Sequence, residues 1–236
     1  SGIVKPGQVV ALMGPSGAGK TTLLDFIAGV KTGGIIEGTI TLNGALKDET
    51  FARYAGYCEQ MDSHMPTLTV REALQVSASL RLDASDMERT ANVDRVIQQL
   101  LLEGYQHQLI GTPGLDGVAP EVRKLVTIGV ELVCSPKVLF LDEPTTGLDS
   151  SSALATMKLA QTVARSNGIA VICTIHQPAC EIFELFDTLL LLQKGGRVAY
   201  FGSVAAMEKY FINVCGCEAI EEGKNPADYS LECASK

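Results

Sequence analysis

The chain has 236 residues, of which 46% are hydrophobic and 19% are charged, and its formal net charge is -8. This length and composition allow a sizeable buried core and exclude an intrinsically disordered protein. The acidic balance argues against a nucleic-acid partner, and no apolar run reaches the roughly 18–20 residues that a membrane span needs. The 7 cysteines lack paired C-x-x-C spacing, which argues against a disulfide framework or a zinc site and favours a reducing cytosolic setting.

Short β-rich runs alternate with helix-like segments, which is typical of an α/β fold with a mostly parallel sheet and crossover helices. Unbroken apolar runs predict strands covered on both faces at 8–13, 138–142, 169–175 and 188–193. A small antiparallel patch is expected from 35–44 and 54–60, and a mainly helical insert from about Thr69 to Val133. From Ser203 onward we expect one helix followed by an irregular tail.

A glycine-rich loop follows the first expected strand. The run "GPSGAGKTT" fits the pattern G-x-x-x-x-G-K-[S/T] and lies between a strand and a helix-forming segment. Glycines let the backbone wrap closely around a phosphate, and successive N–H groups at a helix N-terminus favour negative charge. Lys20 is expected to reach the outer phosphates, and the Thr21 hydroxyl to hold Mg²⁺. The run predicts a nucleoside triphosphate site formed by Gly14, Pro15, Ser16, Gly17, Ala18, Gly19, Lys20, Thr21 and Thr22.

Two acidic residues end a buried strand in "VLFLDEP". An acid at this place, here Asp142, can hold the water shell of Mg²⁺, and a second, here Glu143, can polarise an attacking water. Taken alone, two acids before Pro144 are equally typical of a strand that simply leaves the core. The phosphate loop in the same chain favours the catalytic interpretation.

His176 directly follows the strand "IAVICTI", at the carboxyl end where open α/β sheets place their ligands. A single histidine is more often structural, but only one helix and one strand separate it from Glu143. The two strand ends can therefore be neighbours, and we expect His176 to contact the γ-phosphate. Gln60 ends another expected strand, and its neutral amide can contact both metal and water, although this position alone is weak evidence.

Five features occur in one order: "GPSGAGKTT", Gln60, a helix beginning near Ala119, "VLFLDEP" with "TTGLDS", and "TIHQP". This order resembles the ATP-binding cassette (ABC) ATPase domain, a P-loop NTPase with a RecA-like parallel-sheet core, a small antiparallel β patch and a helical subdomain. The runs "TIGVEL", "DEPTTGLDS", "TIHQP" and "FDTLLLLQKGGRVAYFG" resemble the G subfamily. The closing "NPADYSLE" is similar to the stretch that precedes the membrane domain in full-length pleiotropic drug resistance members.

The resemblance implies roles for individual residues, with ATP and Mg²⁺ as cofactors. Thr21, Gln60 and Asp142 would arrange the metal and water, Glu143 would be the general base, and His176 would be the switch contact to the γ-phosphate. Asp149 would lie where two such domains meet. In this family two cassettes close head to tail, each phosphate loop facing the partner's signature motif, and their closure drives transmembrane domains.

The signature motif departs from the family pattern. Counting back from "TIGVEL", the positions of the family's Ser-Gly-Gly-Glu hold Ala119, Pro120, Glu121 and Val122. Glycines would let backbone N–H groups approach a phosphate, whereas Pro120 has no N–H and Glu121 would repel the phosphate. The helix is therefore expected to begin well but to bind anions poorly. A misalignment by a few residues is the alternative.

An intact phosphate loop with a degenerate signature resembles the second nucleotide-binding domain of full-length pleiotropic drug resistance transporters. The implied partner is another nucleotide-binding domain in the same chain, and the implied location is the cytosolic face of a membrane, within an integral transporter. We expect one ABC domain truncated at its N-terminus, because the family's adenine-stacking aromatic is missing from the first 13 residues. Its ATPase core would span 1–68 and 134–212, its helical subdomain 69–133, and a tail toward a membrane domain 213–236.

The chain alone is expected to be monomeric, with weak or absent ATPase activity. Two alternatives remain at this stage: a soluble ABC ATPase with a non-transport role, and a regulatory nucleotide-binding module without turnover. The residues Glu143 and His176 argue against the second alternative, and the net charge argues against ribosome or DNA-repair work.

Overall fold

The computed structural model describes residues 2–31, 33, 35 and 37–235. The strands are β1 (Val9–Met13), β2 (Thr41–Leu42), β3 (Ala45–Leu46), β4 (Ala55–Cys58), β5 (Val138–Asp142), β6 (Ala170–Thr174), β7 (Thr188–Leu192) and β8 (Val198–Ser203). The α-helices are α1 (Lys20–Ala28), α2 (Val70–Arg81), α3 (Asp86–Gln99), α4 (Pro120–Leu132), α5 (Ser150–Asn167), α6 (Cys180–Phe183), α7 (Met207–Cys215) and α8 (Pro226–Ser235). Short 3₁₀ helices are η1 (Glu49–Arg53) and η2 (Val204–Ala206).

Within the described residues, the main sheet has 6 strands in the order β4-β5-β6-β1-β7-β8. The neighbours from β4 to β7 pair in parallel, whereas β8 runs antiparallel to β7 at the edge. The carboxyl ends of the parallel strands therefore share one edge of the sheet. The segments that follow β1, β4, β5 and β6 meet at this edge, and they carry the expected phosphate-binding, metal-binding and catalytic residues.

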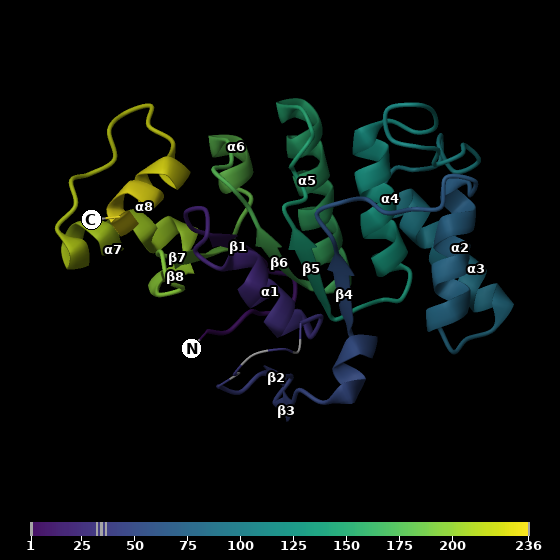
Figure 1. Cartoon of the computed structure of the whole chain (residues 1–236), viewed down its shortest axis with the longest axis horizontal. Coiled ribbons are helices and arrows are strands. Elements are labelled where there is room, and N and C mark those ends of the chain that lie inside the picture. The colour runs from purple at the N-terminus through teal and green to yellow at the C-terminus, as the bar shows by residue number, and fades with distance from the viewer. Residues whose placement is uncertain (1, 32, 34, 36, 236) are drawn as a thin grey trace.

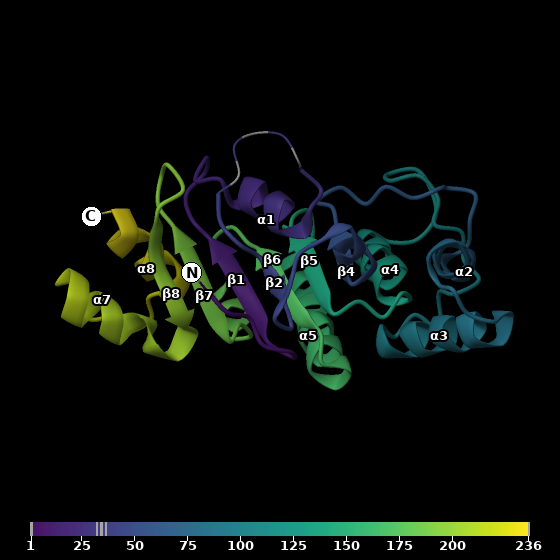
Figure 2. The same ribbon diagram turned by 90° about the horizontal axis from the view of Figure 1, so that it is seen from below.

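Both faces of the main sheet are covered, as the apolar strand runs predict. In β1, Val9, Ala11 and Met13 pack into the larger core on the side of α5, while Val10 and Leu12 pack with α1 on the other face. Figure 2 shows α1 and α5 on opposite sides of the strands. Alternate side chains of one buried strand thus serve two cores, which fixes where β1 ends and the phosphate loop begins.

Helices α2, α3 and α4 form a group beyond β4, at one end of the sheet, and α7 and α8 lie at the other end (Figure 1). Capping boxes begin two of these helices: Thr69 with Glu72 at α2, and Ser85 with Glu88 at α3. The expectation of a mainly helical segment between about Thr69 and Val133 is confirmed, because the long elements of this stretch are α2, α3 and α4.

Two expectations from the sequence were wrong. The run 54–60 does not join an antiparallel patch, because β4 pairs in parallel with β5 at the edge of the main sheet. The small antiparallel patch itself is confirmed, because β2, from the run 35–44, pairs antiparallel with β3 in a separate two-stranded sheet. Residue 36 of this run lies outside the described part of the chain. The tail after α7 is not irregular throughout, since α8 occupies its last part. Strand β8 was not anticipated.

Candidate functional site

The phosphate loop joins β1 to α1 in the predicted position. Gly14, Gly17 and Gly19 have φ values of 155°, 75° and 88°, in the range that favours glycine. At Gly17 and Gly19 a Cβ atom would meet no described atom within 4 Å, whereas at Gly14 it would lie 2.6 Å from the Leu192 carbonyl oxygen. The first position needs glycine for close packing, and the other two keep an open backbone cradle at a helix N-terminus, as anion binding requires.

Lys20 is the first residue of α1 and folds back over the loop. Its Nζ donates to the carbonyl oxygens of Gly14 at 3.0 Å and Pro15 at 3.3 Å, and lies 3.4 Å from Nε2 of His176. Burial lowers the pKa of Lys20, while the nearby carboxylates of Glu143 and Asp142 oppose this shift. A charged ammonium can only donate, so a hydrogen bond between these two groups requires His176 Nε2 as the acceptor.

Asp142 and Thr21 bring oxygen donors together beside the loop. The Thr21 hydroxyl donates to Asp142 Oδ1 at 3.2 Å, and the Thr174 hydroxyl donates to the same oxygen at 2.5 Å. Asp142 is buried, with 6% of its surface exposed. Hydroxyl and carboxylate oxygens are hard ligands of the kind that Mg²⁺ prefers, so this donor set fits the expected cation.

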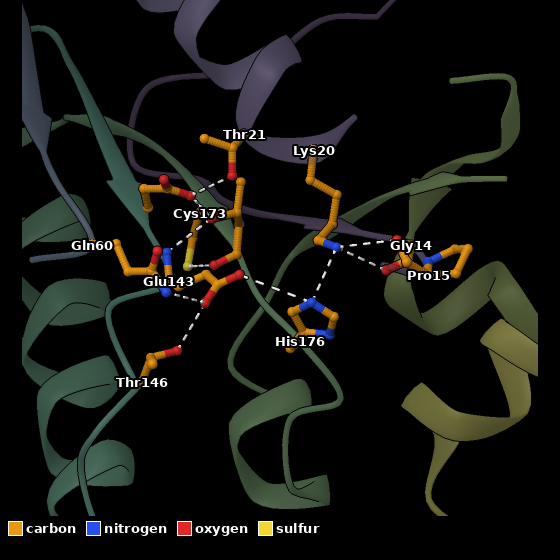
Figure 3. A network of polar contacts seen from close by, with 11 residues as sticks. Gly14, Pro15, Lys20, Thr21, Gln60, Glu143, Thr146, Cys173 and His176 are labelled. Atoms are coloured by element: carbon orange, nitrogen blue, oxygen red, sulfur yellow. Dashed lines mark hydrogen bonds and ion pairs between the residues drawn. The ribbon is translucent and has the colours of Figure 1, made fainter. Parts of the chain in front are cut away.

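Glu143 is fixed on several sides (Figure 3). Gln60 Nε2 donates to its Oε2 at 2.8 Å, and the Thr146 hydroxyl donates to the same oxygen at 3.0 Å. Its Oε1 lies 3.9 Å from His176 Nε2. Its backbone has a φ of 46°, a left-handed conformation that is rare outside glycine and that clusters at functional sites. The structure therefore places Gln60, Glu143 and His176 together, facing Lys20.

Two threonines of this site were missed from the sequence. Thr174 accepts the backbone N–H of Glu143 at 2.8 Å while donating to Asp142, so one hydroxyl orients both acids. A usable signal existed, because Thr174 lies two residues before His176 in a strand expected beside β5. Thr146 gave a weaker signal, since it lies three residues after Glu143 in a turn.

The loop after β6 is held by the start of α8. Asn225 Nδ2 donates to the Pro178 carbonyl oxygen at 2.8 Å, and Gln177 Nε2 donates to Asp228 Oδ1 at 3.2 Å. Both contacts hold residues that directly follow His176, whose side chain is 47% exposed. The histidine side chain is therefore accessible, while the residues after it are held in place by the start of α8.

The expected interface residues lie apart from this cluster. Ala119 is the N-cap of α4, where its methyl group can accept no hydrogen bond, and Pro120 occupies the first turn. Val122 is buried in the larger core at 4% exposure, so its side chain serves packing.

Asp149 is the N-cap of α5, accepting from the N–H groups of Ser151 at 2.9 Å and Ser152 at 3.0 Å. Hydrogen bonds from Ser152 lower the pKa of Asp149.

A phosphate-binding loop after β1, two acids after β5 and a histidine after β6 define the site of a P-loop nucleotide-binding ATPase. The sequence profile described as "ABC transporter" matches residues 1–146. The chain belongs to the ABC transporter family, and it is similar to the ATP-binding domain of G-family members. A second profile, described as "ABC-2 type transporter", matches residues 176–234.

Similar proteins come from plants. The chain is 48% identical to ABC transporter G family member 45 of Oryza sativa subsp. japonica, with all of this chain and 18% of that protein aligned. It is 46% identical to ABC transporter G family member 43 of Arabidopsis thaliana, with all of this chain and 17% of that protein aligned. The chain thus spans less than a fifth of the length of these relatives.

The fold agrees with a solved ABC protein. A structure described as "Structure of ATP binding subunit of ABC transporter" superposes with a TM-score of 0.75 over 100% of this chain and 91% of that one, at 22% identity. This likeness confirms the expected P-loop ABC ATPase fold. Over the described residues, no helix has the length and apolarity to cross a bilayer.

Proposed function

We propose that this chain powers a membrane transporter by hydrolysing ATP, with Glu143 as the general base. The observation that carries the proposal is the fixed position of the Glu143 carboxylate, which accepts hydrogen bonds from Gln60 at 2.8 Å and Thr146 at 3.0 Å. Both bonds leave Oε1 directed toward His176. A carboxylate held in this way is suited to accept a proton from an attacking water.

The neighbouring residues supply binding and orientation. The glycine-rich loop and Lys20 would bind the phosphates, and His176 would sense the outermost one. Thr21 and Asp142, with Gln60, would hold Mg²⁺, which when bound neutralises charge on the phosphates. The main-chain bonds of Lys20 to Gly14 and Pro15 would have to be exchanged for bonds to phosphate oxygens when the nucleotide binds.

We further propose that the chain is the second nucleotide-binding domain of a full-length transporter of the pleiotropic drug resistance type. Its site would be completed by the intact signature motif of a first domain in the same chain. Its own residues 119–122 would face a second ATP that turns over slowly, because Pro120 has no N–H and Glu121 repels phosphate. The match of 176–234 to the "ABC-2 type transporter" profile supports an attached membrane domain. The domain would then lie on the cytosolic face, and the cargo would be small hydrophobic compounds or lipids.

The test is a pair of changes in the full-length transporter. Glu143→Gln keeps the size of the side chain but removes the base, and we expect ATP turnover to fall about 100-fold or more while ATP stays bound. Replacing residues 119–121 with Ser-Gly-Gly should change turnover far less, because that motif serves the slow site. Retention of normal turnover by Glu143→Gln would show that the roles are assigned wrongly.

A further inference from the structure

Helix α4 buries a lysine directly against the segment that carries Gln60. Lys124 is only 2% exposed, and its Nζ forms an ion pair with Asp62 Oδ1 at 2.8 Å. The same Nζ donates to the backbone carbonyl oxygen of Gln60 at 3.0 Å. A buried ammonium is strongly stabilised by such partners, and removal of one partner is costly. The position of Gln60 and the burial of Lys124 are therefore linked.

A second residue of the helix extends this contact. Thr127 lies three residues after Lys124, on the same helical face. Its hydroxyl donates to Asp62 Oδ1 at 2.7 Å, and its oxygen lies 2.8 Å from His64 Nε2. Two side chains of α4 thus hold every second residue of the segment 60–64. They contact the carbonyl oxygen of Gln60 and the side chains of Asp62 and His64.

The network reaches the proposed base in one further step. The Gln60 side chain donates through Nε2 to Glu143 Oε2 at 2.8 Å, while its carbonyl accepts from Lys124. Gln60 itself is exposed, so its own packing does little to fix it. The polar atoms that fix the backbone of Gln60 come from the helix, and the atom that fixes its side chain is Oε2 of Glu143.

We propose that Lys124 is a positioning residue for Gln60, and that α4 couples its partner-facing first turn to Glu143 of the same chain. The first turn of α4 begins at Pro120, one turn before Lys124. A partner domain that shifts this turn would move the Gln60 carbonyl, and with it the amide that holds Glu143. This inference rests on the proposed function. It gives the degenerate signature helix a task in its own chain's site even though it binds phosphate poorly.

Arg123 provides a matched control. It is also buried, with 5% exposure, and stands next to Lys124 in the same helix. Its guanidinium donates to the carbonyl oxygens of Gly111 at 2.9 Å and Ile110 at 2.7 Å, in the loop before α4. Replacement of either residue by methionine removes a buried cation and its main-chain bonds, but only Lys124 contacts Gln60.

The test is a set of double-mutant cycles on ATP turnover in the full-length transporter. We expect Lys124→Met to lower kcat about 10-fold with KM for ATP little changed, as is typical for residues that orient the ligands of a site. In a Gln60→Ala background the same change should lower kcat less than about twofold, because there is no amide left to position. Arg123→Met should change kcat by less than about twofold, both in the wild-type protein and in the Gln60→Ala variant. Equal effects of Lys124→Met with and without Gln60 would overturn the proposal.

A gentler variant covers the case in which Lys124→Met does not fold. Thr127→Val is nearly isosteric and leaves the Lys124–Asp62 ion pair in place while removing the hydroxyl contacts. We expect a smaller loss of kcat that also disappears in the Gln60→Ala background, and an effect that persists there would overturn the proposal. This outcome can be told apart from that of Glu143→Gln. If Glu143→Gln is inactive but the effects of Lys124→Met and Gln60→Ala on kcat are additive, the coupling is refuted and the proposed function is retained.

Discussion

At the scale of single residues, the site depends on side chains that act on two neighbours at once. The Thr174 hydroxyl orients Asp142 and the backbone of Glu143, and Lys20 contacts both the phosphate loop and His176. Lys20, Asp142, Glu143 and His176 could be selected from the sequence because they follow strands that were recognisable. Thr174 could be selected only through its place in a strand expected beside β5, and Lys124 could not be selected, because its role depends on contacts between segments distant in the chain.

His64 gives a prediction at this scale. Burial lowers the pKa of His64 below its ordinary value of 6.5, and the nearby Asp62 opposes this only in part. When the pH falls through 6.5, His64 is protonated in the unfolded chain before it is protonated in the folded chain. The contribution of His64 to the free energy of unfolding is therefore complete above this pH and decreases below it. We expect His64→Gln, which keeps a hydrogen-bonding group beside Thr127, to reduce this acid-induced loss.

The measurement is urea unfolding of both proteins at about pH 7.5 and about pH 5.5, on either side of the ordinary histidine value. The other two histidines are common to both proteins and cancel in the comparison. An equal loss of unfolding free energy in wild type and His64→Gln would contradict the assignment.

At the scale of elements, the sequence predicted best where the residues of one element decide the structure. The phosphate loop and the buried strands β1, β5, β6 and β7 have local patterns that fix them. β4 was assigned to the wrong sheet because its "AGYC" run is short, and its parallel pairing with β5 is a non-local choice. α8 has a start signal in the sequence: Pro226 stands at its first position, after Asn225, whose Oδ1 accepts from the Ala227 N–H at 3.0 Å.

The turn before α4 gives a prediction at the element scale. Gly117 has a φ of 85°, and a Cβ atom there would lie 2.1 Å from the Ile110 carbonyl oxygen, where Val118 N–H donates at 3.2 Å. Gly114 has a φ of 78° with open space around it. Alanine at either position costs about 1–2 kcal/mol for a left-handed residue, and at Gly117 a further ~1–3 kcal/mol for overpacking against backbone.

Urea unfolding of Gly117→Ala and Gly114→Ala measures this difference directly. Because both changes add the same strain, the excess at Gly117 reports the close approach of the two backbone segments. Equal unfolding free energies for the two variants would mean that the chain at 110–117 relaxes freely, and that α4 does not begin at a fixed place.

At the scale of the whole molecule, our proposal assigns to this chain one part of a hydrolytic site that a partner domain completes. The phosphate loop, acids and histidine gather at one edge of the sheet, whereas the first turn of α4 lies in the helical group beyond β4 (Figure 1). Among the described residues, no backbone hydrogen bond joins Pro120 or Glu121 to the phosphate loop. In our account a partner domain supplies the missing signature, and membrane segments beyond this chain use the resulting motion.

The most direct test of this account is the rate of ATP hydrolysis per chain, measured for the purified 236-residue chain over a wide range of concentrations. We predict that the chain binds ATP through its phosphate loop but hydrolyses it weakly or not at all at every concentration. Two copies cannot complete each other's sites, because both carry Ala119, Pro120 and Glu121 in place of the signature. Robust hydrolysis that is independent of concentration and is abolished by Glu143→Gln would show that one chain forms the whole active site, and would contradict the composite-site account.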